Sequence, residues 1–225
     1  MDMYKEIYDL WQKHAKGYFW GDPFDVRFYL THIVACEYSR NMLDVGCSAG
    51  VILHKANAEV KVGVDISIEA LKIGKKMNRN LQLIAASADY LPFRDDVFGR
   101  IICIHTLDAL RKSQQINFIN EIKKILAKDG SLLISGMFYG QSFNPNDKGW
   151  HHGDWIRSLE NYFQVEFYSF DPLGYTILYP LKFVFQLLPN RFEFLPEKIL
   201  HSSLRKKSHE RYGKPYFVKG KLIRK

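Results

Sequence analysis

The sequence has few cysteines and no long uninterrupted apolar run. Only three of its 225 residues are cysteines, Cys36, Cys47 and Cys103, and this odd, scattered set excludes a disulfide framework and a cysteine zinc site. The most apolar stretch, residues 173–188, contains a proline and a lysine and is shorter than the roughly 20 residues of a membrane span. The N-terminus shows no signal-peptide pattern. We therefore expect a cytoplasmic chain without a transmembrane segment.

Net charge is absent from most of the chain and concentrated at its end. The formal charge is +8, yet residues 191–225 hold eleven Lys and Arg against three Glu, which leaves 21 residues of each sign in residues 1–190. A basic C-terminal segment suits contact with nucleic acid, anionic lipid or an acidic partner. A solvated basic surface without a dedicated partner explains the same pattern, so both interpretations stay open.

Hydrophobic periodicity predicts an α/β fold. Residues 1–39 predict an N-terminal cap of two helices, the second beginning at Asp22-Pro23, a good N-cap and first-turn pair. Strands and helices then alternate, which predicts a doubly wound parallel sheet with helices on both faces. The expected strands are residues 42–45, 60–64, 81–85, 100–104 and 131–138, and the expected helices are residues 49–58, 67–80 and 113–127.

The last third departs from this alternation. A helix is expected over residues 153–162, a strand over 165–170, and a closing edge strand over 216–223. Between them, residues 171–213 are apolar and proline-containing and predict a helical insert. We divide the single domain into a cap (1–39), a Rossmann-like core (40–170), the insert (171–213), and a closing strand with the basic tail (214–225).

A glycine-containing loop directly follows the first predicted core strand. It reads Asp44-Val45-Gly46-Cys47-Ser48-Ala49-Gly50 and opens a helix. Glycines let a backbone turn tightly and approach a ligand closely. The dinucleotide pattern G-x-G-x-x-G is not met, because Ser48 stands where a glycine is required. Asp44 suits the ammonium of an amino-acid tail, or the N–H groups of the loop, better than a pyrophosphate.

The same residues also fit the G-x-S-x-G nucleophile elbow, with Ser48 as the nucleophile. A hydrolase of that type builds several strands before its elbow, whereas this loop follows the first recognisable strand. The position in the chain therefore favours a cofactor loop over a hydrolase.

Acidic residues follow the next two strands. Asp65 ends the second strand about 20 residues past the loop, a position suited to ribose hydroxyls. A plain helix-capping role for Asp65 is the alternative. Asp89 follows the third strand and can accept a hydrogen bond from an adenine amino group, while Ala88 offers its N–H to the ring.

Three segments together, Leu43–Gly50, Gly63–Asp65 and Ala88–Val97, resemble the class I S-adenosylmethionine (SAM)-dependent methyltransferases, in the type 11 branch that includes ubiquinone and menaquinone biosynthesis. The run Asp89–Phe98 is similar to a segment habitual in that branch. The resemblance covers about residues 40–137. It implies a seven-stranded, mostly parallel sheet with an antiparallel last strand, and SAM as cofactor with S-adenosylhomocysteine (SAH) as product.

The resemblance also implies roles for individual residues. Those assigned to the cofactor are Asp44, Gly46, Cys47, Ser48 and Gly50 in the loop, Asp65 and Ile66 after the second strand, Ala88 and Asp89 after the third, Ile104 at the end of the fourth, and Tyr18 from the N-terminal helices. Two residues after the fourth strand, His105 and Asp108, are the candidate catalytic residues beside the acceptor. The branch often carries a His pair where Asp108-Ala109 stand here, so its substrates do not transfer.

The acceptor is expected to be a small molecule, including a lipid-linked or carrier-linked one. The sequence lacks both an [Asp/Asn]-Pro-Pro-aromatic and a Pro-Cys motif, which argues against methylation of amino groups on DNA bases or protein glutamine and of cytosine C5. The apolar insert at 171–213 is either a lid, a membrane-facing helix or plain core packing. An RNA methyltransferase that uses the basic tail, and a non-catalytic SAM-binding protein, are the alternatives.

Overall fold

In the computed structural model, the part of the chain described is residues 30, 33–107, 110–137, 158–170, 204–206 and 215–222. Tyr18 with the first predicted N-terminal helix, the catalytic candidate Asp108, and most of the insert lie outside the described residues. Of the second predicted helix, residues 30 and 33–36 are described, and they are helical. Among the helices within these ranges, none combines the length and apolarity that a membrane crossing requires.

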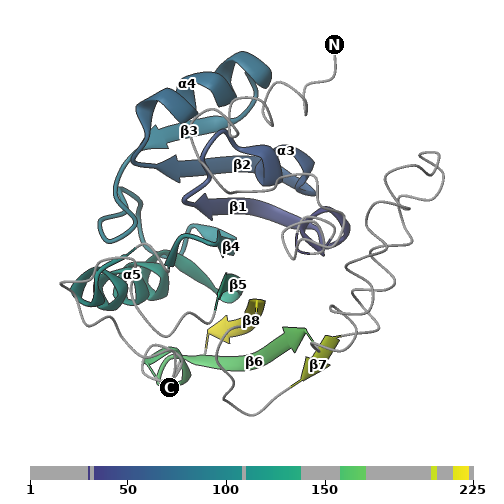
Figure 1. Cartoon of the computed structure of the whole chain (residues 1–225), viewed down its shortest axis with the longest axis vertical. Helices are drawn as coiled ribbons and strands as arrows, with labels where there is room; N and C mark the ends of the chain where they lie inside the picture. Colours follow the sequence, from purple (N-terminus) through teal and green to yellow (C-terminus); the bar gives the residue numbers. More distant parts are fainter. Residues whose placement is uncertain are drawn as a thin grey trace.

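The described residues form one sheet of eight strands, one more than the seven expected, in the order β3-β2-β1-β4-β5-β8-β6-β7 (Figure 1). The strands are β1 Ser39–Val45, β2 Ala58–Asp65, β3 Gln82–Ala85, β4 Phe98–Ile104, β5 Leu126–Met137, β6 Phe163–Phe170, β7 Leu204–Lys206 and β8 Pro215–Leu222. Strands β1 to β5 pair in parallel, and β8 is antiparallel to both β5 and β6. The predicted mostly parallel α/β sheet with an antiparallel last strand is confirmed.

The C-terminal strands differ from expectation in two ways. The last strand, β8, was predicted at an edge, but it lies inside the sheet because it pairs along its length with β5 on one side and β6 on the other. Residues 204–206, placed in the predicted helical insert, form the short strand β7 antiparallel to β6. Without β7, the outer edge of β6 would expose unpaired N–H and C=O groups. Residues 204–206 pair with that edge.

Three helices lie wholly within the described residues: α3 Val51–Lys55, α4 Ile68–Met77 and α5 Lys112–Ile125. The expected Ser67 cap is confirmed, since its side chain accepts a hydrogen bond from the N–H of Ala70 at 3.3 Å. Helix α3 is shorter than the predicted 49–58, because residues from Ala58 on pair with β1 and extend β2. Pairing with a neighbouring strand here outweighs local helix propensity.

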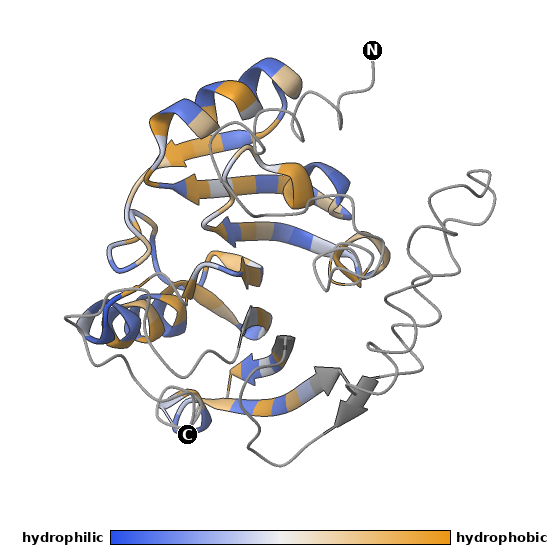
Figure 2. Ribbon diagram, in the orientation of Figure 1, coloured by the Kyte–Doolittle hydropathy of each residue, from blue (hydrophilic) through white to orange (hydrophobic). Residues whose placement is uncertain are grey.

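Apolar clusters cover both faces of the sheet. On one face, Phe118, Ile119, Ile122 and Ile125 of α5 pack on the inward residues of the sheet. On the other, Ile52 and Leu53 of α3 and the helical residues 33–36 pack over β1, β4 and β5. Figure 2 shows hydrophobic and hydrophilic residues alternating along β6, which is the pattern of a strand buried on one face only.

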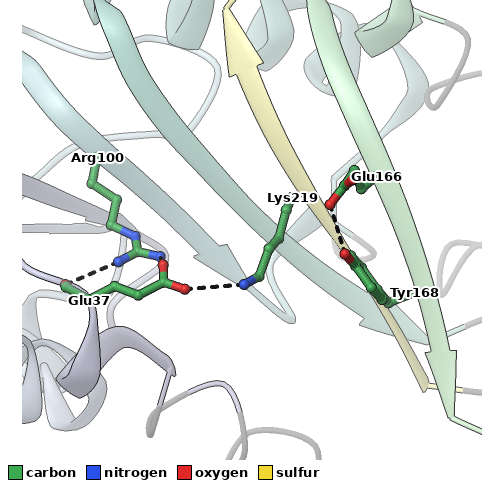
Figure 3. Close-up of polar contacts among 5 residues, drawn as sticks. All are labelled: Glu37, Arg100, Glu166, Tyr168 and Lys219. Carbon is green, nitrogen blue, oxygen red and sulfur yellow. Dashed lines mark hydrogen bonds and ion pairs between the residues drawn. The ribbon is translucent and has the colours of Figure 1, made fainter. Parts of the chain in front are cut away.

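A buried arginine joins the N-terminal part of the described chain to the sheet (Figure 3). Arg100 of β4 is only 4% exposed. Its guanidinium donates to the main-chain oxygen of Glu37 at 3.1 Å and also to the Glu37 carboxylate. Lys219 of β8 donates to the same carboxylate at 3.1 Å. Burial raises the pKa of Glu37, but the charges and hydrogen bonds of Arg100 and Lys219 outweigh it and lower that pKa overall.

Replacement Glu37→Gln is expected to lower the free energy of unfolding at neutral pH by roughly 1–3 kcal/mol, because it leaves the buried guanidinium of Arg100 without a carboxylate. Urea denaturation measures the change. A lowered pKa in the folded state stabilises the fold above the ordinary pKa of the carboxyl, so the deficit of the variant should shrink as pH falls through the folded pKa.

The exposed pair Lys124–Asp95, 3.8 Å apart, supplies the matched control. Asp95→Asn should cost at most about 1 kcal/mol. Equal losses for Glu37→Gln and Asp95→Asn would contradict a structural role for the Arg100 cluster.

Candidate functional site

The carboxyl ends of four adjacent strands meet at one edge of the sheet. The chain runs from β1 through β2 to β3 on one side, then returns to place β4 on the other side of β1. Ligands of open α/β sheets bind outside the strand ends at such a switch point. The loop Gly46–Gly50, Asp65 and His105 follow or end the strands that border it, so the topology brings together residues predicted separately from sequence.

Most main-chain donors of the glycine loop are used within the protein. The N–H groups of Gly46 and Cys47 both donate to the main-chain oxygen of Val64, at 2.7 and 3.0 Å. The N–H of Ser48 donates to Asp65 Oδ2 at 2.8 Å, and that of Gly50 to the oxygen of Cys47 at 2.8 Å. A phosphate cradle needs several such groups pointing at the ligand. This loop is therefore suited to a ligand held by side chains.

Gly46 is required for two reasons. Its φ of +78° lies in the left-handed region, and a Cβ there would stand 1.9 Å from Thr106 Oγ1. On this side of Gly46, the Thr106 side chain makes the close approach that was predicted for a ligand. Thr106 was not identified from the sequence, because nothing local to residues 104–108 signals a contact with residue 46.

The side chain of Cys47 points into the sheet. A Cβ on Gly63 would lie 2.6 Å from Cys47 Sγ, so the glycine in the second motif makes room for this thiol. Burial, followed by the charges of Asp44 and Asp65, raises the pKa of Cys47. The thiol therefore stays neutral.

Asp65 joins the loop to the next helix. Its two carboxylate oxygens accept from the N–H groups of Ser48 and Ser67, each at 2.8 Å. Asp65 therefore also binds the start of α4, as the helix-capping alternative expected, although Ser67 itself occupies the N-cap position. A carboxylate has about four lone-pair positions, so Asp65 can still accept from two hydroxyl groups.

Asp44 is buried below the loop, with 3% of its surface exposed. Burial first, and the charge of Asp65 second, raise the pKa of Asp44 from 3.8 to about 8. Near neutral pH the side chain is therefore mostly a neutral acid. A cation beside it would favour the ionised form.

The segment after β3 is held in place from two sides. Ala86 donates its N–H to the main-chain oxygen of Asp65 at 3.2 Å, and Leu91 donates to the Glu121 carboxylate of α5 at 2.9 Å. Between them, the Ser87 hydroxyl donates to Asp89. Asp89 is thus fixed near the end of β3.

The chain bends sharply after β4. His105 has a φ of +55°, and its N–H donates to the main-chain oxygen of Ser135 in β5 at 3.0 Å. Positive φ in a residue other than glycine is uncommon and often occurs at functional sites. Ile104 pairs in register with Ser135, whose side chain is fully buried and whose hydroxyl has no hydrogen-bond partner among the described residues. No sequence pattern marks Ser135.

Comparison with known proteins relates this core to a family. Residues 43–134 match the family model described as a methyltransferase domain. The chain is 32% identical over 114 residues to demethylmenaquinone methyltransferase from Renibacterium salmoninarum, covering 47% of this chain and 44% of that protein. It is 31% identical over 93 residues to an uncharacterised protein from Methanocaldococcus jannaschii, covering 41% and 39%.

Solved structures extend the likeness in fold to the whole chain. The N-methyltransferase NodS from Bradyrhizobium japonicum, in complex with SAH, superposes with a TM-score of 0.66 at 11% identity and covers 100% of both chains. The aligned regions span 36% to 42% of the length of three similar archaeal proteins. The sequence relationship therefore concerns the domain core, and the structural likeness shows the fold.

The structure brings most of the predicted cofactor residues to one edge of the sheet. They are Asp44, Gly46, Cys47, Ser48, Gly50, Asp65, Ile66, Ala88, Asp89 and Ile104. Ile66 is 76% exposed at the rim, and Ala88 is buried. Tyr18 and Asp108 fall outside the described residues, and within the described ranges no group of three His, Cys, Asp or Glu is placed to hold a metal ion.

Asp44→Asn should stabilise the ligand-free domain increasingly as pH rises. Between the ordinary pKa of 3.8 and the folded value of about 8, the folded protein keeps a proton that the unfolded chain has lost. The stability of the wild type therefore falls with pH in this window, by at most about 1.4 kcal/mol per unit. Urea denaturation at pH 5, 6.5 and 8 measures the difference. A difference in the free energy of unfolding between wild type and Asp44→Asn that does not change with pH would contradict a buried, protonated Asp44.

Proposed function

We propose that the chain is a SAM-dependent methyltransferase that acts on a small-molecule acceptor. One observation carries the proposal: Asp44, Asp65 and Asp89 stand at the ends of three adjacent parallel strands, around a loop that keeps most of its N–H groups for its own fold. The ligand that suits this edge carries an ammonium and hydroxyl groups in place of phosphates.

The donor and acceptor chemistry of the residues fits SAM. Asp44 would take the ammonium, Asp65 would accept from the two ribose hydroxyls, and Asp89 with the N–H of Ala88 would take the adenine. Bound SAM supplies a methyl group already activated by a sulfonium. The protein then has to align the acceptor and exclude water.

The acceptor side lies past β4. His105 would contact the acceptor and take its proton where the acceptor is a hydroxyl or a protonated amine. The buried Ser135 hydroxyl, beside Ile104 in register, is a further polar group on this side. Asp108 stays a predicted catalytic residue.

A small acceptor is favoured over RNA. The named relatives include a demethylmenaquinone methyltransferase and an N-methyltransferase, which supports a small molecule, including a lipid-linked one. The basic C-terminal segment supports the RNA alternative, but Lys219 of that segment is paired with Glu37. The Glu37 carboxylate occupies the ammonium group of Lys219 that a phosphate would otherwise contact.

The proposal predicts that the purified chain binds SAM and SAH, one molecule per chain, and does not bind ADP. Asp89→Ala should weaken SAH binding roughly tenfold, because a hydrogen bond to a charged group is lost. The exposed Asp95 serves as control, and Asp95→Asn should bind like the wild type. Isothermal titration calorimetry measures the three affinities. Binding of ADP without SAH would contradict the proposal.

A further inference from the structure

We infer that the hydroxyl of Thr106 donates a hydrogen bond to the carboxylate of the amino-acid tail of SAM. The inference rests on the proposed function and assigns a positioning residue within it. Thr106 lies two residues beyond β4, on the far side of His105 from the strand.

The Thr106 side chain lies against the glycine loop. Three atoms of the Thr106 side chain, Oγ1, Cγ2 and Cβ, would lie within 1.9 to 2.6 Å of a Cβ on Gly46, and the hydroxyl oxygen is the nearest. The hydroxyl is therefore held against the first glycine of the loop. The left-handed bend at His105 turns the chain across the sheet edge and so brings a residue of the β4 end onto the loop that follows β1.

The glycine loop has few hydrogen-bond donors left for the carboxylate of the tail. A zwitterionic tail brings a carboxylate as well as an ammonium, and a carboxylate needs hydrogen-bond donors. Four of the five N–H groups from Gly46 to Gly50 already donate within the protein. Asp44 would accept from the ammonium and would repel the carboxylate. Because the loop has few N–H groups left, a side-chain donor beside it is favoured as the partner of the carboxylate.

Of the two hydroxyls that border the loop, those of Ser48 and Thr106, the one on Thr106 is placed for the tail. The N–H of Ser48 binds Asp65, so Ser48 stands on the side proposed for ribose. Thr106 follows Ile104 and His105, on the side proposed for the tail and the acceptor. Its hydroxyl makes a hydrogen bond of 3.4 Å to the main-chain oxygen of Ile104, near the upper limit for such a bond. Exchanging this bond for a shorter one to a carboxylate is favourable.

The test compares SAH with 5′-methylthioadenosine, which keeps the adenosine and the thioether but lacks the amino-acid tail. Thr106→Ala should weaken SAH binding about tenfold, by the loss of a charge-assisted hydrogen bond, and leave the binding of 5′-methylthioadenosine unchanged. Thr106→Ser loses the same methyl group but keeps the hydroxyl, and should bind SAH like the wild type. Calorimetry supplies all the affinities, and thermal unfolding confirms that each variant is folded.

Each other outcome is informative. Equal weakening of SAH binding by Thr106→Ala and Thr106→Ser, or equal weakening of both ligands by Thr106→Ala, would overturn the inference and leave Thr106 a packing residue. Should Thr106→Ala not fold, Thr106→Val removes the hydroxyl while keeping the shape, and the same ratio of the two affinities is read from it. Failure of the wild type to bind either ligand would instead overturn the proposed function.

Discussion

The carboxylate of Asp65 is the contact on which the arrangement of the site depends. One oxygen accepts from Ser48 in the glycine loop and the other from Ser67 at the start of α4. Together with the two N–H groups that donate to Val64, it fixes the loop over the ends of β1 and β2. Because the loop is held through its own N–H groups, those groups are not available to a phosphate. The same contact that builds the loop therefore selects against nucleotides and in favour of a ligand bound by side chains.

A buried acid beneath this loop links stability to binding. Asp44 lies almost fully out of solvent, near Asp65, and its raised pKa keeps it mostly protonated at neutral pH. Keeping a carboxyl group in that place costs stability as the pH rises. A bound ammonium compensates by favouring the carboxylate. In the proposed function, the ligand's ammonium group thus offsets the cost in stability of burying the Asp44 carboxyl.

Local patterns predicted the parts of this molecule that local chemistry determines. The strand endings at Val45 and Asp65 and the Ser67 cap all follow from residues within a few positions of each other. The sequence could not predict the contact of Thr106 with Gly46, since it joins residues far apart through the order of β1 and β4. The inner place of β8 and the pairing of β7 with β6 likewise depend on which edges remain open.

In the proposed complex, the ammonium group of the ligand stabilises the Asp44 carboxylate, so Asp44 releases its proton to the buffer when the ligand binds. Calorimetric titration of SAH at pH 6.5, in two buffers of different ionisation enthalpy, measures the protons released on binding. The account predicts release of about one proton per SAH, because a group with a pKa of about 8 becomes ionised, and none with 5′-methylthioadenosine. Binding of SAH with the same heat in both buffers would contradict it.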